Sequence, residues 1–217
     1  MLGVVTGLAA EAKIVADLRC HAVCGGGRVA ATQQKIERLV AEGATGLISF
    51  GIAGALDPRL KAGDLVISAT VIDDSARCYV GDPNWLEQAL ALLPHAYAGD
   101  IYGSDSIISS VADKELIFKQ YSSLAVDMES HHMARMAARL ELPFIVLRAI
   151  ADNAGEALPS AFGAGVDEDG QSRPWPIIAA LLRGRLRLRE VLRVAKSTNS
   201  ALETLRACRP VVAALAG

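Results

Sequence analysis

The most constraining feature of this sequence is a set of continuous apolar runs that end in glycine or in an acid. They cover residues 2–7, 46–51, 65–72 and 143–150. A strand with one face in water alternates apolar and polar residues, whereas a continuous run is typical of a strand buried on both faces. We therefore predict a central sheet that is covered by helices on both sides.

Segments with helical spacing lie between these runs. We predict helices at residues 9–18, 29–42 and about 128–140, with Gly43 as the C-terminal cap of the second one. Strands that alternate with helices indicate an α/β architecture. The expected fold is α/β, with three layers in the order α/β/α, as one domain over residues 1–217.

Composition excludes several classes of protein. The net charge is -2, with 22 basic and 24 acidic side chains, so no excess of positive charge points to nucleic acid. The four cysteines have no paired spacing, and we expect neither a metal site nor a disulfide framework. No window holds the roughly eighteen apolar residues of a membrane span. The opening lacks a basic leader, so the cytoplasm is the expected compartment.

A basic amphipathic region covers residues 177–209. Leucines alternate there with Arg183, Arg185, Arg187, Arg189, Arg193 and Lys196. Two interpretations remain open. The arginines could form a solvated face over an ordinary packing helix, or the region could make peripheral contact with a membrane surface.

Candidate site residues follow the predicted strands. Glu11, the glycine segment 51–54, the 127–129 segment and Asp152 come just after apolar runs, and ligands of α/β folds bind at the carboxyl ends of strands. Taken singly, each has an ordinary explanation. An acid at a helix start is often a cap, and two nearby glycines can be a tight connection.

Together these residues suit sugar and base chemistry. A carboxylate accepts two hydrogens from a ribose diol, and an acid that is shielded from water can stay protonated and donate its proton. Glycine lets backbone N–H groups approach a ligand closely.

The joint order of motifs resembles the purine phosphorylases and the methylthioadenosine/S-adenosylhomocysteine nucleosidases. The matching strings are GLAAEA from Gly7, GGGRVAA from Gly25, SFGIAGAL from Ser49, LKAGDLVIS from Leu60, VDMES from Val126 and LRAIADNA from Leu147. They cover about the first two thirds of the chain. The resemblance implies a nucleoside phosphorylase-like fold with a mixed central sheet, and a homo-oligomer.

The resemblance also implies roles for single residues. Glu129 would bind the ribose 2′- and 3′-hydroxyls, with Met128 packed against the sugar, and Asp152 would protonate N7 of the purine or hydrogen-bond to it. The backbone near Ile107 would read the purine edge. The side from which the nucleophile attacks would be lined by Gly7, Gly51 and Ile52. No metal or redox cofactor is implied, and inorganic phosphate is the co-substrate of the phosphorylases.

The nucleophile stays open between phosphate and water. Bacterial hexameric phosphorylases carry arginines where Glu11 and Ser49 stand, whereas a glutamate near position 11 is the nucleosidase pattern, in which it activates water. Arg28 or Arg148 could still supply charge for phosphate. Arg28 could equally be a surface residue, and Arg148 could pair with a buried acid.

The opening VVTGLAAEAK and the basic tail resemble most closely the hopanoid-associated phosphorylases. This implies release of adenine from adenosylhopane. The alternatives are a soluble methylthioadenosine/S-adenosylhomocysteine nucleosidase and, from another class, a non-catalytic nucleoside-binding protein. A dinucleotide-binding fold is disfavoured, because the glycines at 25–27 lack the GxGxxG spacing.

Overall fold

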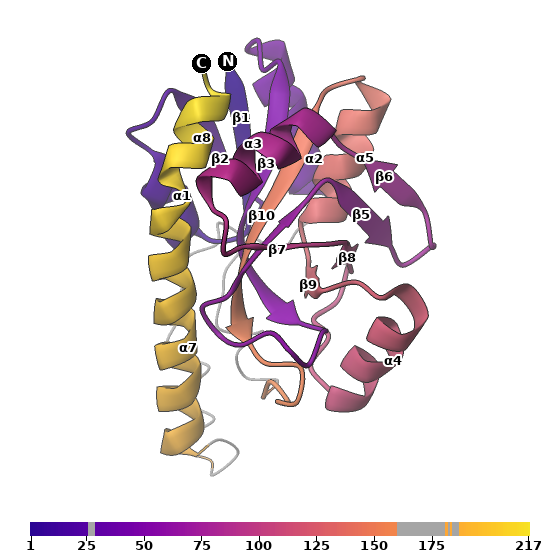
Figure 1. Ribbon diagram of the computed structural model, residues 1–217, viewed down its shortest axis with the longest axis vertical. Coiled ribbons are helices and arrows are strands. Elements are labelled where there is room, and N and C mark those ends of the chain that lie inside the picture. Colours follow the sequence, from indigo (N-terminus) through magenta and orange to yellow (C-terminus); the bar gives the residue numbers. More distant parts are fainter. Residues whose placement is uncertain (26–28, 160–180, 182, 184–186) are drawn as a thin grey trace.

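The computed structural model describes residues 1–25, 29–159, 181, 183 and 187–217 (Figure 1). Its strands are β1 (Leu2–Thr6), β2 (Cys20–Cys24), β3 (Gly46–Ala55), β4 (Leu65–Ser68), β5 (Thr70–Asp73), β6 (Cys78–Val80), β7 (Tyr97–Ala98), β8 (Ile101–Gly103), β9 (Ala125–Asp127) and β10 (Phe144–Asp152). Its helices are α1 (Ala9–Val15), α2 (Val29–Ala41), α3 (Pro83–Leu92), α4 (Val111–Tyr121), α5 (Ser130–Arg139), α7 (Leu188–Ala207) and α8 (Arg209–Leu215).

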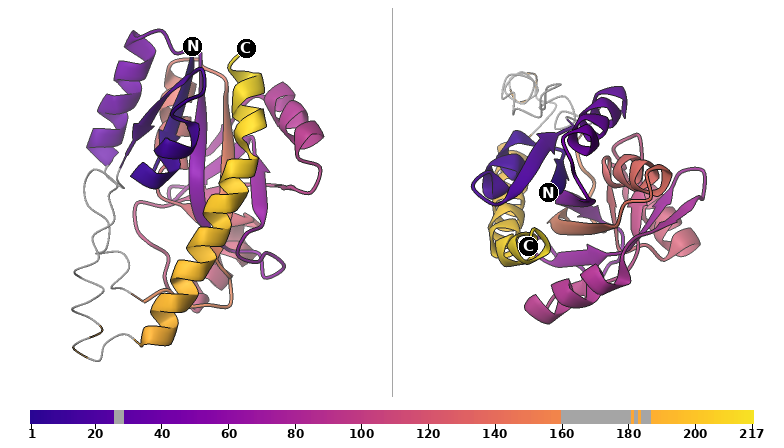
Figure 2. Two further views of the ribbon diagram at one scale, coloured as in Figure 1. Left: turned by 90° about the vertical axis from the view of Figure 1, so that its left-hand side faces the viewer. Right: turned by 90° about the horizontal axis from the view of Figure 1, so that it is seen from above.

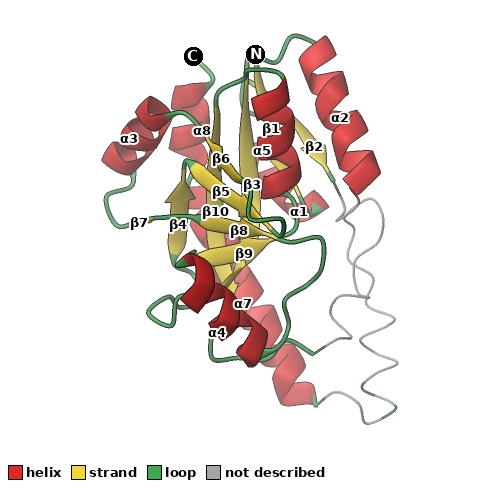
Figure 3. Ribbon diagram, turned by 90° about the vertical axis from the view of Figure 1, so that its right-hand side faces the viewer, coloured by secondary structure: helices red, strands yellow, loops and turns green. Residues whose placement is uncertain are grey.

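The strands form one mixed sheet in the order β6-β5-β8-β9-β3-β10-β4-β7, with β1 beside β3 and β2 beside β1 (Figure 3). At its centre, β1, β3 and β10 are parallel neighbours. The flanking strands β4 and β9 run antiparallel to β10 and β3. Only Ala69 separates β4 from β5 along the chain, although these strands lie in different arms of the sheet, so the sheet curls.

Helices cover both faces of the sheet (Figure 2). One face packs against α2 and α5 around buried apolar side chains such as Ile36, Leu47 and Met133. The other face packs against α1, α3, α7 and α8 around Phe50 and Leu205. The predicted three-layer α/β fold is therefore confirmed, and the mixed sheet with it.

Two details of the predicted strands are wrong. The glycine segment 51–54 does not end a strand, because β3 continues through it to Ala55. The apolar run 65–72 is not one strand. It breaks at Ala69, where the Ser68 hydroxyl donates to the carbonyl of Thr70 and accepts its N–H. A local side-chain hydrogen bond thus replaces the regular ladder.

The basic region divides into two parts within the described residues. The second half of α7 buries Ala201 and Leu205 against the sheet, whereas Leu188 and Leu192 in the first half are 63% and 62% exposed. No helix among the described residues is both long and apolar enough to span a bilayer. Arg185 lies outside the described residues. Cys20, Cys78 and Cys208 are free cysteines.

Candidate active site

Glu11 lies in the first turn of α1, and its carboxylate is turned into the molecule. Oε2 accepts the backbone N–H groups of Gly7 and Leu8 at 2.9 and 2.8 Å, and Oε1 accepts that of Ile52 at 2.8 Å. The side chain is buried. Burial raises the pKa of Glu11, although Arg148 and these N–H groups oppose the shift.

Arg148 occupies the middle of β10 and is fully buried. Its Nε lies 2.6 Å from Oδ2 of Asp127, and its Nη2 donates to the Ser49 hydroxyl at 2.6 Å. Asp127 also caps α5, because its Oδ1 accepts the N–H of Ser130 at 2.8 Å. The sequence left two roles open for Arg148, and the structure pairs it with a buried acid.

Glu129 completes this group, which we call the buried network: Glu11, Asp127, Glu129 and Arg148. Oε2 of Glu129 lies 3.6 Å from Nη2 of Arg148. Burial raises the pKa of Glu129 to about 7, with Arg148 opposing the shift and Asp127 and Glu11 adding to it. Among the described residues, these three acids thus share one arginine.

Two glycines make room for the buried network. A Cβ on Gly7 would stand 2.7 Å from Oε1 of Glu129. A Cβ on Gly51 would stand 2.8 Å from Oε1 of Glu11 and would overlap Nη1 of Arg148. The side chains of residues 11, 129 and 148 therefore converge at these two glycines.

Asp152 is the last residue of β10, just after a β-bulge that shifts the register against β3. Bulges commonly re-aim a side chain beside an active site. A Cβ on Gly54 would lie 3.1 Å from both carboxylate oxygens of Asp152. Gly51 and Gly54 are three residues apart on β3, or about 10 Å. Arg148 pairs with Gly51 and Asp152 with Gly54, so the buried network and Asp152 follow one another along the same two strands.

Asp152 forms an ion pair with Lys114 of α4. The same ammonium group donates to the carbonyl oxygens of Asn153 and Glu156, each at 3.0 Å. We call these four residues the strand-end clamp. Burial raises the pKa of Asp152, and Lys114 opposes this shift most strongly.

The remaining predicted site residues occupy the surroundings. Met128 is half-buried between Asp127 and Glu129. Ile107 lies in the loop after β8 and is 43% exposed. The N–H of Ile52 is taken up by Glu11, as described above. Arg28 lies outside the described residues.

Sequence reasoning missed Lys114, and it missed a second polar group. Nε2 of His131 and Nε2 of His132 lie 2.9 and 3.0 Å from Oδ1 of Asp105. Imidazole nitrogens and a carboxylate in this arrangement could hold a metal ion. The adjacent histidines in the printed sequence were the available signal. Sequence reasoning had predicted no metal, and that prediction remains untested.

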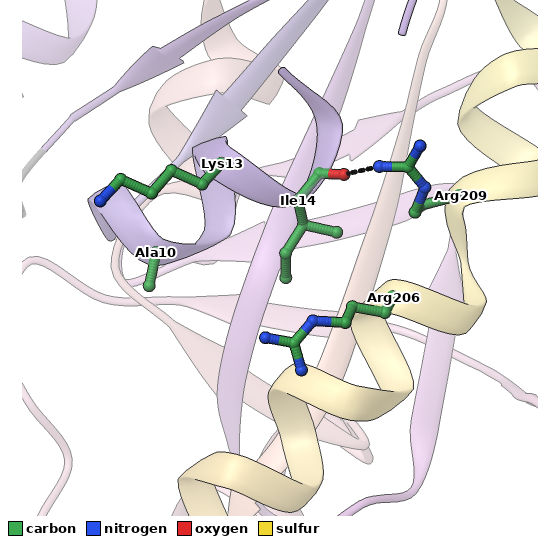
Figure 4. A pocket seen from close by; sticks show the side chains of 5 residues that line it. All are labelled: Ala10, Lys13, Ile14, Arg206 and Arg209. Carbon is green, nitrogen blue, oxygen red and sulfur yellow. Dashed lines mark hydrogen bonds between the residues drawn. The ribbon is translucent and has the colours of Figure 1, made fainter. Parts of the chain in front are cut away.

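Two hollows lie outside the buried network. One is lined by residues of α1 and of the α7–α8 corner, where Arg209 donates to the carbonyl of Ile14 (Figure 4); its lining is Ala10, Lys13, Ile14, Arg206 and Arg209. The other adjoins the strand-end clamp between α4 and the segment after β10. Its volume is about 390 Å³, and its lining is mostly apolar: Leu56, Pro58, Val111, Glu115, Phe118, Lys119, Ala154 and Gly155.

Curated relatives of this chain are nucleosidases. The 5′-methylthioadenosine/S-adenosylhomocysteine nucleosidase of Staphylococcus epidermidis is 29% identical over 143 residues, which are 56% of this chain and 63% of that protein. The aminodeoxyfutalosine nucleosidase of Helicobacter pylori is 25% identical over 67% of this chain and 72% of that protein. The chain spans less than two thirds of the length of the first relatives that it matches.

Solved structures share the fold. The 5′-methylthioadenosine/S-adenosylhomocysteine nucleosidase from Neisseria meningitidis, in complex with methylthio-immucillin-A, superposes with a TM-score of 0.72. The alignment covers 98% of both chains at 16% identity. The sequence pattern of the phosphorylase superfamily matches residues 5–174, which include every residue of the buried network and of the strand-end clamp. The chain therefore belongs to the phosphorylase superfamily.

Proposed function

We propose that this protein cleaves the N-glycosidic bond of a purine nucleoside. One observation carries the proposal: the buried carboxylates of Glu11 and Glu129 meet at Gly7 and Gly51, and Asp152 lies over Gly54 on the same strand. Carboxyl groups suit both parts of a nucleoside, because a carboxylate accepts the hydrogens of a ribose diol and a shielded acid donates a proton to a base. The nucleosidases of Staphylococcus epidermidis and Helicobacter pylori, to which the chain is similar, support the same reaction.

The proposed roles follow from the chemistry of bond cleavage. Glu129 accepts hydrogen bonds from the ribose 2′- and 3′-hydroxyls, which fixes the sugar, and Met128 packs against it. The C1′–N9 bond breaks through an oxocarbenium-like state, and the departing purine takes a proton at N7 from Asp152. The backbone at Ile107 contacts the base.

We infer that water is the nucleophile rather than phosphate. The N–H groups of Gly7 and Ile52, which could hold a phosphate, already donate to Glu11, and Arg148 is paired with Asp127. Within the described part of the chain, a phosphate dianion would meet three carboxyl groups and one arginine that they already share. A buried glutamate with a raised pKa is suited instead to take a proton from water.

For the substrate, we propose adenine release from adenosylhopane, with methylthioadenosine and S-adenosylhomocysteine as the alternatives named for the relatives. The exposed Leu188 and Leu192 support an apolar substrate, because they could enter a lipid surface beside Arg189 and Arg193. The protein would then work in the cytoplasm at the membrane surface, as a homo-oligomer.

The central experiment measures adenine release from each substrate with and without inorganic phosphate. We expect release without phosphate, and Asp152→Asn to lower kcat about a hundredfold or more. The matched control is Asp74→Asn, an exposed acid with no assigned role. Unchanged release by Asp152→Asn would overturn the proposal. Strict dependence on phosphate would favour phosphorolysis, and nucleoside binding without release would favour a binding protein.

A second experiment tests the lipid surface. The wild-type protein should sediment with anionic vesicles, and the double variant Leu188→Ser/Leu192→Ser should sediment less. Turnover of adenosylhopane by the variant should fall, while its turnover of methylthioadenosine should not. A truncation is unsuitable, because Ala201 and Leu205 of the same helix belong to the core. Equal sedimentation of both proteins would remove the membrane proposal. Sedimentation velocity without lipid gives the oligomeric state.

A further inference from the structure

Lys114 carries a buried charge that the reaction described above does not use. It lies within α4, and its side chain is 0% exposed. A lysine ammonium has three N–H donors, and here they meet the carboxylate of Asp152 and the carbonyl oxygens of Asn153 and Glu156. Because an unpaired buried charge is costly, the fully satisfied ammonium makes this a built contact.

The contact lies where the strand ends. Regular pairing of β10 stops at Asp152, after the bulge. The following segment is tied to its neighbours by a hydrogen bond from Ala62 N–H to Asn153 Oδ1 at 2.8 Å, and by one from Leu158 N–H to the Ser109 carbonyl at 2.9 Å. These two hydrogen bonds hold the backbone of the segment and its neighbours. Among the described residues, Lys114 is the group that forms an ion pair with the Asp152 side chain itself.

We propose that Lys114 is a positioning residue for glycosidic cleavage, whose ammonium group aims the Asp152 carboxylate from α4. The proposal rests on the role of Asp152 given under the proposed function. Lys114 binds Oδ2, and Oδ1 makes no hydrogen bond to the described residues. Oδ1 is thus the oxygen left for the purine, and its direction is set by the grip on its partner oxygen.

Lys114 also governs the charge of Asp152. Burial and, more weakly, Glu156 raise the pKa of Asp152, whereas Lys114 and, more weakly, Arg193 lower it. Loss of the ammonium group therefore leaves Asp152 protonated up to a higher pH. If Asp152 is the acid that protonates N7, activity should then persist further into alkaline solution.

Two variants separate charge from packing. Lys114→Met removes the charge and all three donors, while Lys114→Gln removes the charge and one donor but keeps two N–H donors. In both, we expect the alkaline limb of kcat/KM for adenine release to move up by about 1–3 pH units. We expect kcat of Lys114→Met to fall about tenfold to a hundredfold through misplacement of the acid. The matched control is Lys119→Met on the same helix, because the Lys119 side chain is 70% exposed and forms an ion pair with Glu115 on the helix surface.

The outcomes distinguish this inference from the proposed function. If Asp152→Asn lowers release but the alkaline limbs of both Lys114 variants match the wild type, Lys114 is only structural and the inference fails. If Asp152→Asn itself releases adenine normally, the proposed function fails first. If Lys114→Met does not fold, the pKa of the Asp152 carboxyl group can be measured by ¹³C titration in Lys114→Gln, where we again expect it to be higher than in the wild type. An unshifted titration would again refute the inference.

Discussion

The buried network and the strand-end clamp both pair carboxylates with one basic side chain, but they draw these groups from different elements. Both place carboxylates where water is scarce. The network takes Asp127 from β9, Glu11 and Glu129 from the starts of α1 and α5, and the fully buried Arg148 from the middle of β10. The clamp uses one lysine from α4, which packs on a small separate apolar cluster of Leu56, Tyr102 and Val126.

The fold fixes the buried network more firmly than it fixes Asp152. Arg148 is held by the ladder of β10 on both sides, against β3 and against β4. Asp152 lies past a bulge and is only partly buried, at 18% exposure of its side chain. We therefore expect changes in the network to act on stability first and changes in the clamp to act on catalysis first.

The largest expected effect is that of Arg148→Met. It leaves Asp127 and its neighbouring acids buried without a cation, and breaking a buried pair in this way costs about 3–5 kcal/mol. Urea denaturation should show the loss, and it should deepen as pH rises because the acids ionise. The control is Arg38→Met, which should change little because Arg38 is exposed and pairs with Glu42 on the surface of α2. A stable Arg148→Met protein would contradict the view that this arginine organises the network.

Gly51→Ala comes next. The added methyl group would meet Nη1 of Arg148 and Oε1 of Glu11, both pinned by other hydrogen bonds, so we expect a loss of about 1–3 kcal/mol. At Gly54 the same change brings a methyl group 3.1 Å from the more exposed Asp152 carboxylate, which can move by a few tenths of an ångström. Gly54→Ala should thus lower kcat while leaving the melting temperature almost unchanged. Gly155→Ala, with nothing within 4 Å, serves as the control.

This contrast between the glycines also shows what the sequence could predict. The strands β1, β3 and β10 were predicted because continuous apolar runs record burial on both faces. The interpretation of residues 51–54 as a turn was wrong, because glycine marks either a turn or a close approach. The approaching groups, Glu11 and Arg148, are distant in the chain, so no local pattern could distinguish the two.

The candidate site was predicted in part for a related reason. Glu11, Glu129 and Asp152 follow apolar runs, so their positions at strand ends could be read from the sequence. Lys114 lies on α4, which was not predicted. A lysine at a buried position interrupts the apolar spacing of a helix, and its partner Asp152 is in a different element. Burial of a charge is visible only once both elements are placed.

Glu129 gives a smaller, pH-dependent test of the network. Its pKa is about 7 in the folded protein against an ordinary 4.5, so the folded state binds the proton more tightly than the unfolded chain. The stability from this group is complete below the ordinary value and is lost as pH rises through about 7. Glu129→Gln should flatten the decline in denaturation midpoint between about pH 5 and pH 8. An equally steep decline in the variant would assign the pH dependence to other groups.

The smallest expected effect is that of Arg193→Gln. Nη1 of Arg193 lies 3.7 Å from Oε1 of Glu156 at the outer rim of the clamp, and such exposed pairs contribute less than about 1 kcal/mol. Arg193 also lowers the pKa of Asp152, but less than Lys114 does. Its removal should therefore move the alkaline limb of kcat/KM in the same direction as Lys114→Gln, by a smaller amount. Equal shifts in the two variants would mean that Asp152 responds to the general field of nearby cations and not to its direct contact with Lys114.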